Sequence, residues 1–314
     1  MKPVKTEFIP GDVIADRYEV ERRIGRGGMG MVYQVKDRLS GQSLALKTLL
    51  PQYVAHGKAV QRFIREINAV RRLNHPAIVK IYDAKKLGPL MFYTMDYIEG
   101  KSLRVWIQER GRLGFNSTVR ILALLAHALE HAHQCTIHRD LSPENVMVLA
   151  DGSIRLLDFG LAKLTDTDAA FTMIGISLGK KQYNAPEQRF SAAEVDLRAD
   201  IYSLGVMFYE MLSGKLPKRD TSLSELVPEL PPECSAFVEK AMAPSPDERF
   251  ATAREFRLAL LDLYHQCTAE EEAEEPEQPV LRSPSRLRSL WDRAKRWGTR
   301  LSRRIPLRKS RASQ

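Results

Sequence analysis

Cysteine and long apolar runs are scarce in this 314-residue sequence. The three cysteines, Cys135, Cys234 and Cys267, cannot all pair and show no Cys-x-x-Cys spacing, so we expect reduced thiols in a cytoplasmic compartment. No run of about 18 uncharged apolar residues exists, so the sequence predicts no membrane-spanning helix. The first residues, Met-Lys-Pro-Val-Lys-Thr-Glu, also lack the apolar centre of a secretion signal.

Acidic residues are nearly absent from one stretch near the C-terminus. Residues 282–311 hold twelve lysines and arginines and a single acid, Asp292. The net charge of the whole chain is +9, of which this stretch contributes +11 and the remainder −2. A near-neutral body and a strongly basic tail predict two regions with different roles.

Hydrophobic periodicity divides the body into two parts. Short strand patterns occur at 17–24, 31–36, 43–48, 78–82 and 90–97, and one helical pattern at 59–73 lies between them. From residue 101 the pattern becomes mainly helical, at 117–133, 199–212 and 252–264. We predict an α+β fold with two lobes, a small β-rich N-lobe with one helix (17–97) and a larger, mainly helical C-lobe (101–265), with a cleft between them.

The flanking segments have distinct compositions. Residues 1–16 are expected to be an N-terminal extension. Residues 269–279 carry six glutamates and two prolines, so we expect a disordered acidic linker over 266–281. The basic tail, 282–314, follows it.

A glycine cluster lies between the first two strand patterns, in a G-x-G-x-x-G-x-V arrangement. Glycine lets the backbone approach a phosphate chain closely and offer N–H groups to its oxygens. A dinucleotide fold is disfavoured because a strand, not a helix, follows the glycines. The candidate phosphate-binding residues are Gly25, Gly27, Gly28 and Gly30.

Lys47 ends the third strand pattern, and Glu66 lies on the apolar side of the predicted helix. A carboxylate there needs a cation as partner, because a lone buried charge is costly. Lys47 paired with Glu66 would hold its ammonium group against the α- and β-phosphates of a nucleotide.

Two acidic motifs follow, His-Arg-Asp-Leu-Ser-Pro-Glu-Asn at 138–145 and Asp-Phe-Gly at 158–160. Asp158 and Asn145 offer hard oxygen ligands of the kind that Mg²⁺ prefers. Asp140 can accept a proton from an attacking hydroxyl. Phosphoryl transfer needs bound metal ions, positioning and a proton acceptor more than covalent chemistry. These residues offer metal ligands and a proton acceptor in short, ordered motifs.

These four ordered motifs resemble the bacterial Hanks-type (eukaryotic-like) serine/threonine protein kinase family over residues 17–265. The resemblance implies ATP and Mg²⁺ as cofactors, protein Ser/Thr hydroxyls as acceptors and autophosphorylation. It also implies an ion pair between Glu187 and Arg249. Adenine and ribose would contact residues of the sheet, the hinge and the C-lobe, namely Ile24, Val32, Ala45, Met95, Tyr97, Glu99 and Met147. The alternative is a pseudokinase, an ATP-binding scaffold with little turnover.

The sequence departs from the family at two related positions. Ser142 replaces the usual catalytic-loop lysine, and Lys180 replaces a threonine that in the family lies beside that lysine. We interpret the pair as an exchange in which Lys180 supplies the missing charge near Asp140. The loop between them holds the expected autophosphorylation sites, Thr172 first and Ser177 second.

The basic tail has an amphipathic pattern. On a helix of about 100° per residue, Leu287, Leu290, Trp291, Ala294, Trp297, Leu301 and Ile305 fall on one side, and the charged residues of 286–305 fall on the other. This pattern favours an anionic membrane surface, at the inner face of a membrane, over a nucleic acid. Docking on the chain's own kinase lobe or on a partner protein remains open.

His127 and His131 are spaced i, i+4 in a predicted helix, the spacing of a metal-binding pair. No acid or cysteine completes a site on that helix face. We therefore interpret both as helix-packing side chains.

Overall fold

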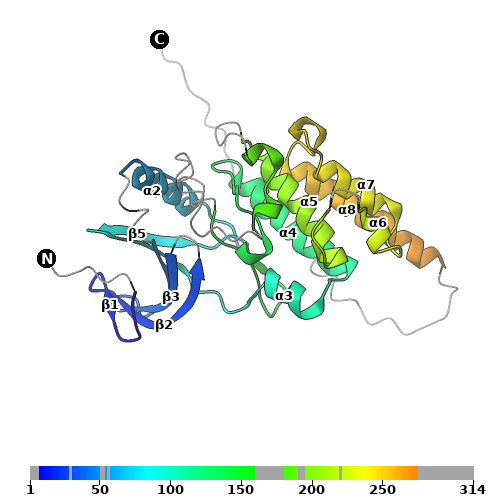
Figure 1. The fold of residues 1–314 in the computed structure, drawn as a ribbon. Helices are drawn as coiled ribbons and strands as arrows, with labels where there is room; N and C mark the ends of the chain where they lie inside the picture. The colour runs from blue at the N-terminus through cyan, green and yellow to red at the C-terminus, as the bar shows by residue number, and fades with distance from the viewer. Residues whose placement is uncertain are drawn as a thin grey trace, which may run out of the picture. The chain divides into compact units, whose positions relative to one another are not determined.

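A computed structural model describes residues 7–27, 30–49, 54, 57–159, 180–189, 195–218 and 221–274. The chain begins with a curled sheet crossed by one helix and continues into a helical lobe, as predicted (Figure 1). The two lobes belong to one compact unit. None of the described helices is long and apolar enough to cross a bilayer.

The N-lobe sheet is antiparallel, with strand order β1-β2-β3-β4-β6-β5. Helix α2 (Gly57–Arg71) packs beside it (Figure 1). The strands are β1 (Val13–Ile14), β2 (Tyr18–Gly27), β3 (Gly30–Asp37), β4 (Ser43–Leu49), β5 (Ile81–Leu87) and β6 (Leu90–Asp96).

Gly25 and Gly27 lie at the end of β2 and Gly30 at the start of β3, where Gly25 pairs with Val32 and Gly27 with Gly30. A Cβ atom on Gly30 would lie 1.6 Å from the carbonyl oxygen of Thr48, so only glycine fits there. The backbone of β3 therefore lies directly against β4 at the position where the lysine-bearing strand ends.

Alternate residues of β6 face opposite sides of the sheet. Leu90 and Phe92 join the outer apolar cluster formed with β2 and β3. Met91, Tyr93 and Met95 join the inner cluster, which continues through α2 into the helical lobe. This two-residue period is the expected pattern of a strand with apolar residues on both faces.

The C-lobe is mainly helical and carries a small second sheet of order β7-β8-β9. Its apolar core lies chiefly along α4 and α5, which are buried over most of their length. The elements are β7 (Lys101–Ser102), α3 (Leu103–Arg110), α4 (Phe115–Ala132), η1 (Pro143–Asn145), β8 (Val146–Val148), β9 (Ile154–Leu156), η3 (Lys180–Tyr183), η4 (Pro186–Arg189), α5 (Arg198–Ser213), α6 (Leu223–Leu226), α7 (Pro232–Ala241), η5 (Pro246–Glu248) and α8 (Ala253–Glu274).

Among the differences from the sequence predictions, the following concern segments near the ends and the junction of the lobes. The strand predicted at 78–82 begins only at Ile81, as β5, because residues 78–79 bond to Leu156 of β9 instead. Within the expected N-terminal extension, β1 pairs with β2 and buries Ile14. Helix α8 runs to Glu274, into the expected acidic linker, because alanine and glutamate favour helix until Pro276 disfavours it.

The two helix-packing histidines have an unexpected neighbour. Nε2 of His75, from the turn after α2, lies 3.1 Å from Nδ1 of His127, and the rings of His75 and His131 stack. Burial and the two neighbouring imidazoles lower the pKa of His75 to about 4. No group of three metal-ligating side chains is found in the part of the chain that the structure describes.

Candidate active site

Lys47 and Asp158 join the two lobes by an ion pair. Nζ of Lys47, on β4, donates to Oδ2 of Asp158 at 2.6 Å, and both side chains are mostly buried. Asp158 follows β9 and has a φ of 50°, a backbone conformation that costs energy for a residue with a side chain. The structure therefore holds this carboxylate in a fixed and unusual orientation.

Tyr93 binds the second oxygen of the same carboxylate. Its hydroxyl donates to Oδ1 of Asp158 at 2.7 Å, and its side chain is 1% exposed. Burial, together with the nearby carboxylate, raises the pKa of Tyr93 well above its ordinary value of 10. The phenol is therefore protonated at neutral pH and acts as a hydrogen-bond donor.

Asp140 and Asn145 lie together in the loop between α4 and β8. Nδ2 of Asn145 donates to the backbone oxygen of Asp140 at 2.7 Å and to its Oδ2 at 3.1 Å. The backbone N–H of Leu157 bonds to the carbonyl of Asn145, one residue before Asp158. The three polar residues predicted to serve the chemistry are thus linked through two short segments.

His138 also links the segment of Asp140 to the segment of Asp158. Its Nε2 donates to the carbonyl of Leu157 at 2.9 Å, and its Nδ1 accepts the backbone N–H of Asp140 at 3.3 Å. One donating and one accepting nitrogen describe a neutral imidazole. Burial lowers the pKa of His138 and favours that form. The ring of Phe159 packs on it, with centroids 4.7 Å apart.

Asp200, in the first turn of α5, anchors the loop that carries Asp140. Its two carboxylate oxygens accept the backbone N–H groups of His138 and Arg139, both at 2.8 Å, and Nε2 of His133 at 2.9 Å. Burial opposes its ionisation, yet the bonds from the histidines lower the pKa of Asp200 below its ordinary value. Arg139, which it holds, has a φ of 61°.

The segment 180–189 is tied to the rest of the C-lobe by several side chains. Glu187 and Arg249 form the expected ion pair, with two bonds of 2.7 and 2.8 Å. Gln188 donates to the carbonyl of Arg139 at 3.0 Å. This segment is therefore attached both to Arg249, which precedes α8, and to the loop of Asp140.

Arg104 of α3 connects the segment 180–189 with η1 and α5 through its guanidinium group. It donates to Glu144 at 2.7 Å and to Glu210 at 2.6 Å, and it also contacts the hydroxyl of Tyr183. Tyr183 in turn donates to Glu210. Burial and the Glu210 carboxylate raise the pKa of Tyr183 far above its ordinary value, so it stays protonated.

The residues expected around adenine lie on the inner side of the sheet and in the second sheet. Val32 pairs with Lys47 across β3 and β4, and Ala45 pairs with Met95 across β4 and β6. Ile24 follows Arg23 at a register shift in β2 and is 36% exposed.

The remaining hinge and second-sheet residues lie beyond β6. The hydroxyl of Tyr97 accepts a bond from Arg22 at 2.8 Å, Glu99 is exposed, and Met147 is a half-buried residue of β8.

Several predicted residues lie outside the described part of the structure. Glu66 lies within α2 and Lys180 begins η3, but neither side chain is described, so the predicted Lys47–Glu66 pair stays a prediction. Gly28, Thr172 and Ser177 lie wholly outside the described residues, as does the tail. Ser142, whose exchange with Lys180 is predicted, is 1% exposed.

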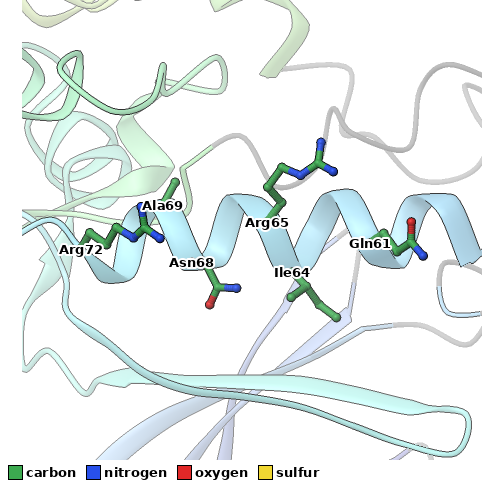
Figure 2. A pocket seen from close by; sticks show the side chains of 6 residues that line it. All are labelled: Gln61, Ile64, Arg65, Asn68, Ala69 and Arg72. Carbon is green, nitrogen blue, oxygen red and sulfur yellow. The ribbon is translucent and has the colours of Figure 1, made fainter.

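A hollow of about 390 Å³ lies on α2, away from these residues (Figure 2). None of the predicted site residues lines it, so we do not assign the nucleotide to it. Its described lining comes from one helix, namely Gln61, Ile64, Arg65, Asn68, Ala69 and Arg72.

Two members of the site were missed by sequence reasoning. Tyr93 resembles any core residue of an alternating strand, and nothing in its neighbours signals that its hydroxyl reaches Asp158. Arg104 sits in a short helix that the sequence pattern did not predict, and its partners are 40 to 106 residues away. Neither could be found without the tertiary structure.

Comparisons with known proteins identify the family of this chain. Residues 18–274 match the family model described as protein kinase domain. The chain is 34% identical over 272 residues to the serine/threonine-protein kinase PknB of Mycolicibacterium smegmatis, covering 80% of this chain and 43% of that protein. It is 36% identical over 263 residues to Pkn1 of Myxococcus xanthus, covering 77% and 38%.

A solved structure gives the same result. The PknI kinase domain of Mycobacterium tuberculosis aligns with a TM-score of 0.70 and 30% identity, covering 82% of this chain and all of that one. The chain spans about two fifths of the length of the curated relatives it matches. It belongs to the protein kinase domain family, on the branch of the bacterial serine/threonine kinases.

Proposed function

We propose that this chain transfers the γ-phosphoryl group of ATP to serine or threonine hydroxyls of proteins. The observation that carries the proposal is the convergence of Lys47, Asp140, Asn145 and Asp158 at the junction of the two lobes, through the bonds described above. The serine/threonine kinases named among the relatives support the choice of acceptor.

The donor set fits magnesium. Asp158 and Asn145 are two hard oxygen ligands, and Mg²⁺ is usually held by one or two such groups together with water and substrate phosphates. The side chain of Asp158 is 26% exposed, so part of it reaches solvent at the junction of the lobes. When bound, the metal would neutralise charge on the phosphates.

The chain's own residues perform the remaining tasks. Lys47 would bind the α- and β-phosphates, and the β2–β3 hairpin would cover the phosphate chain with its backbone N–H groups. Asp140 would orient the acceptor hydroxyl and take its proton. Asn145 holds the Asp140 carboxylate through its amide, so the proton acceptor and the metal site keep a constant spacing.

The direct test is an assay of the purified chain with γ-labelled ATP, MgCl₂ and a general acceptor such as myelin basic protein. Wild type should label the acceptor and itself, on serine and threonine only. Asp140→Asn is the control for contaminating kinases. Equal labelling by both proteins, or labelling of neither, would contradict the proposed activity.

We propose that Lys180 supplies the charge that Ser142 cannot. A unit charge about 4 Å from a phosphate is worth up to roughly 4 kcal/mol at an effective dielectric near 20. Lys180→Ala should therefore lower kcat at least tenfold with little change in nucleotide affinity. Lys181→Ala is the matched control, and similar small effects of both substitutions would exclude the exchange.

We propose that phosphate on Thr172, or secondarily Ser177, activates the chain through Arg139. Nε of Arg139 is buried and has no hydrogen-bond partner among the described residues. Phosphate binds arginine through charge-assisted hydrogen bonds and can order a loop in this way. The double variant Thr172→Ala/Ser177→Ala should lose both activity and phosphate by mass spectrometry, whereas an unchanged variant would rule these sites out.

We propose that the tail holds this cytoplasmic kinase at the inner face of an anionic membrane. The support is the sequence pattern of 286–305, with Trp291 and Trp297 among leucines and arginines at the edges. Each basic residue near such a surface contributes about 1 kcal/mol.

Vesicle co-sedimentation tests the tail. The full chain should pellet with phosphatidylserine-containing vesicles at moderate salt, and Trp291→Ser/Trp297→Ser should pellet much less. Equal binding to purely neutral vesicles, or none to anionic ones, would leave docking on a protein as the role of the tail.

A further inference from the structure

The bond between Tyr93 and Asp158 is not explained by the residues assigned so far. Tyr93 lies opposite Lys47 in the register of β6 and β4. Side chains opposite each other on neighbouring strands share one face of the sheet, so both reach toward the helical lobe from the same side. There they contact different oxygens of one carboxylate, Lys47 at Oδ2 and Tyr93 at Oδ1.

The ring of Tyr93 is held on the side of α2. Its centroid lies 5.9 Å from that of Phe63, in the middle of that helix, and both residues are at least 95% buried. A ring fixed by packing leaves its hydroxyl little freedom, so the position of the donor is set by the sheet and by α2 together. The carboxylate is therefore held by one charged donor and one rigid neutral donor.

Two donors on opposite oxygens fix the plane of a carboxylate, which a single donor cannot do. Each carboxylate oxygen carries two lone-pair positions, so one oxygen of a carboxylate can accept a hydrogen bond and bind a cation at the same time. Outer hydrogen bonds of this kind orient metal-binding side chains, and their removal costs about 10- to 100-fold in metal affinity.

We propose that Tyr93 is a positioning residue for the magnesium site, acting through Asp158. This inference rests on the proposed function, in which Asp158 binds the metal. The hydroxyl presents the carboxylate in the orientation that the metal–nucleotide complex requires. Since Phe63 packs on the same ring, the position of α2 contributes to metal affinity through Tyr93.

The test measures metal-dependent nucleotide binding rather than activity. A fluorescent ATP analogue is titrated into the full chain at saturating Mg²⁺ and again in EDTA, and Mg²⁺ is titrated at fixed analogue. Tyr93→Phe, which keeps the ring, should raise the Mg²⁺ concentration at half-saturation about tenfold. Binding in EDTA should stay unchanged, because no metal is involved.

Tyr18→Phe is the matched control. Tyr18 is also a fully buried tyrosine of the same sheet, and its hydroxyl donates to an aspartate, Asp83, at 3.1 Å. It belongs to the outer apolar cluster and not to the inner one. If loss of any buried phenol–carboxylate bond weakened the lobe enough to affect the metal, both variants would shift the Mg²⁺ midpoint equally, and the proposal would be wrong.

Two further variants separate the remaining outcomes. Tyr93→Met removes the hydroxyl with a flexible apolar replacement, so it must shift the midpoint in the same direction even if Tyr93→Phe folds poorly. Asp158→Asn should abolish the metal-dependent part of binding. If it does not, the proposed function fails; if it does and neither Tyr93 variant shifts the midpoint, only the role of Tyr93 is overturned.

Discussion

Asp158 and Asp200 carry the same side chain in two different surroundings. Asp158 lies where the lobes meet, is 26% exposed and accepts bonds from two side chains, Lys47 and Tyr93. Asp200 lies behind the loop of Asp140, has no exposed side-chain surface and accepts two backbone N–H groups and one imidazole.

The difference shows that the surroundings of a carboxylate decide whether it stabilises the fold or is able to bind a ligand. A buried carboxylate whose bonds come from the backbone can only hold that backbone in place, and its loss is a loss of structure. A partly exposed carboxylate held by side chains keeps access to a ligand, and its loss is a loss of chemistry. We therefore expect substitution of the aspartates at the junction of the lobes, Asp140 and Asp158, to lower turnover. Substitution of the buried Asp200 should instead lower the stability of the fold.

The largest expected effect on turnover comes from Asp140, at the junction of the lobes. Asp140→Asn removes the proton acceptor but keeps a side chain of the same size, so kcat should fall by about 10²- to 10⁴-fold. Urea denaturation should show a free energy of unfolding close to that of wild type. A variant that loses activity only because it unfolds would break the comparison.

Substitution of the buried Asp200 should instead lower the free energy of unfolding. Asp200→Ala leaves two buried N–H groups and His133 without their acceptor, and we expect a loss of about 3–5 kcal/mol in the free energy of unfolding. Asp247→Ala is the control, since Asp247 also accepts a hydrogen bond, from the side chain of Arg198, but is 86% exposed. Its removal should cost less than about 1 kcal/mol.

The pH dependence of stability gives the smallest and most specific effect. The pKa of Asp200 is lower in the folded chain than its ordinary value of 3.8. Its contribution to stability is therefore complete above that value and is lost as the pH falls toward the folded pKa. Below about pH 4, stability should decline less steeply in Asp200→Asn than in wild type, by about 1.4 kcal/mol per pH unit. Parallel urea titrations that keep equal slopes would contradict the assignment.

The sequence alone could name the candidate site residues because each stands in a short motif with a local cause, and their roles stay predictions. The glycines of the hairpin, Lys47 at the end of β4 and the two acidic motifs are all recognisable from residue type and spacing alone, and the two-lobed fold is confirmed. The ion pair of Glu187 with Arg249 was also correctly expected from the family resemblance.

The parts that could not be predicted depend on contacts distant in sequence. Tyr93 bonds to a residue 65 positions away, and its strand pattern is equally well satisfied by an aliphatic side chain. The strands of the second sheet are two or three residues long, too short for a periodic signal. The sequence prediction ends α8 too early because a run of glutamates suggests disorder, although glutamate is also a good helix former.

The anchoring of the loop by Asp200 has a consequence for the order of events during synthesis. The backbone amides of His138 and Arg139 find their acceptor 62 and 61 residues later in the chain. A ribosome adding about 5–20 residues per second needs roughly 3–12 seconds to cover that interval. Throughout that time the loop of Asp140 lacks its anchor. The loop that carries Asp140 therefore gains its buried anchor only after the start of α5 has been made, so it cannot take its final conformation before that point.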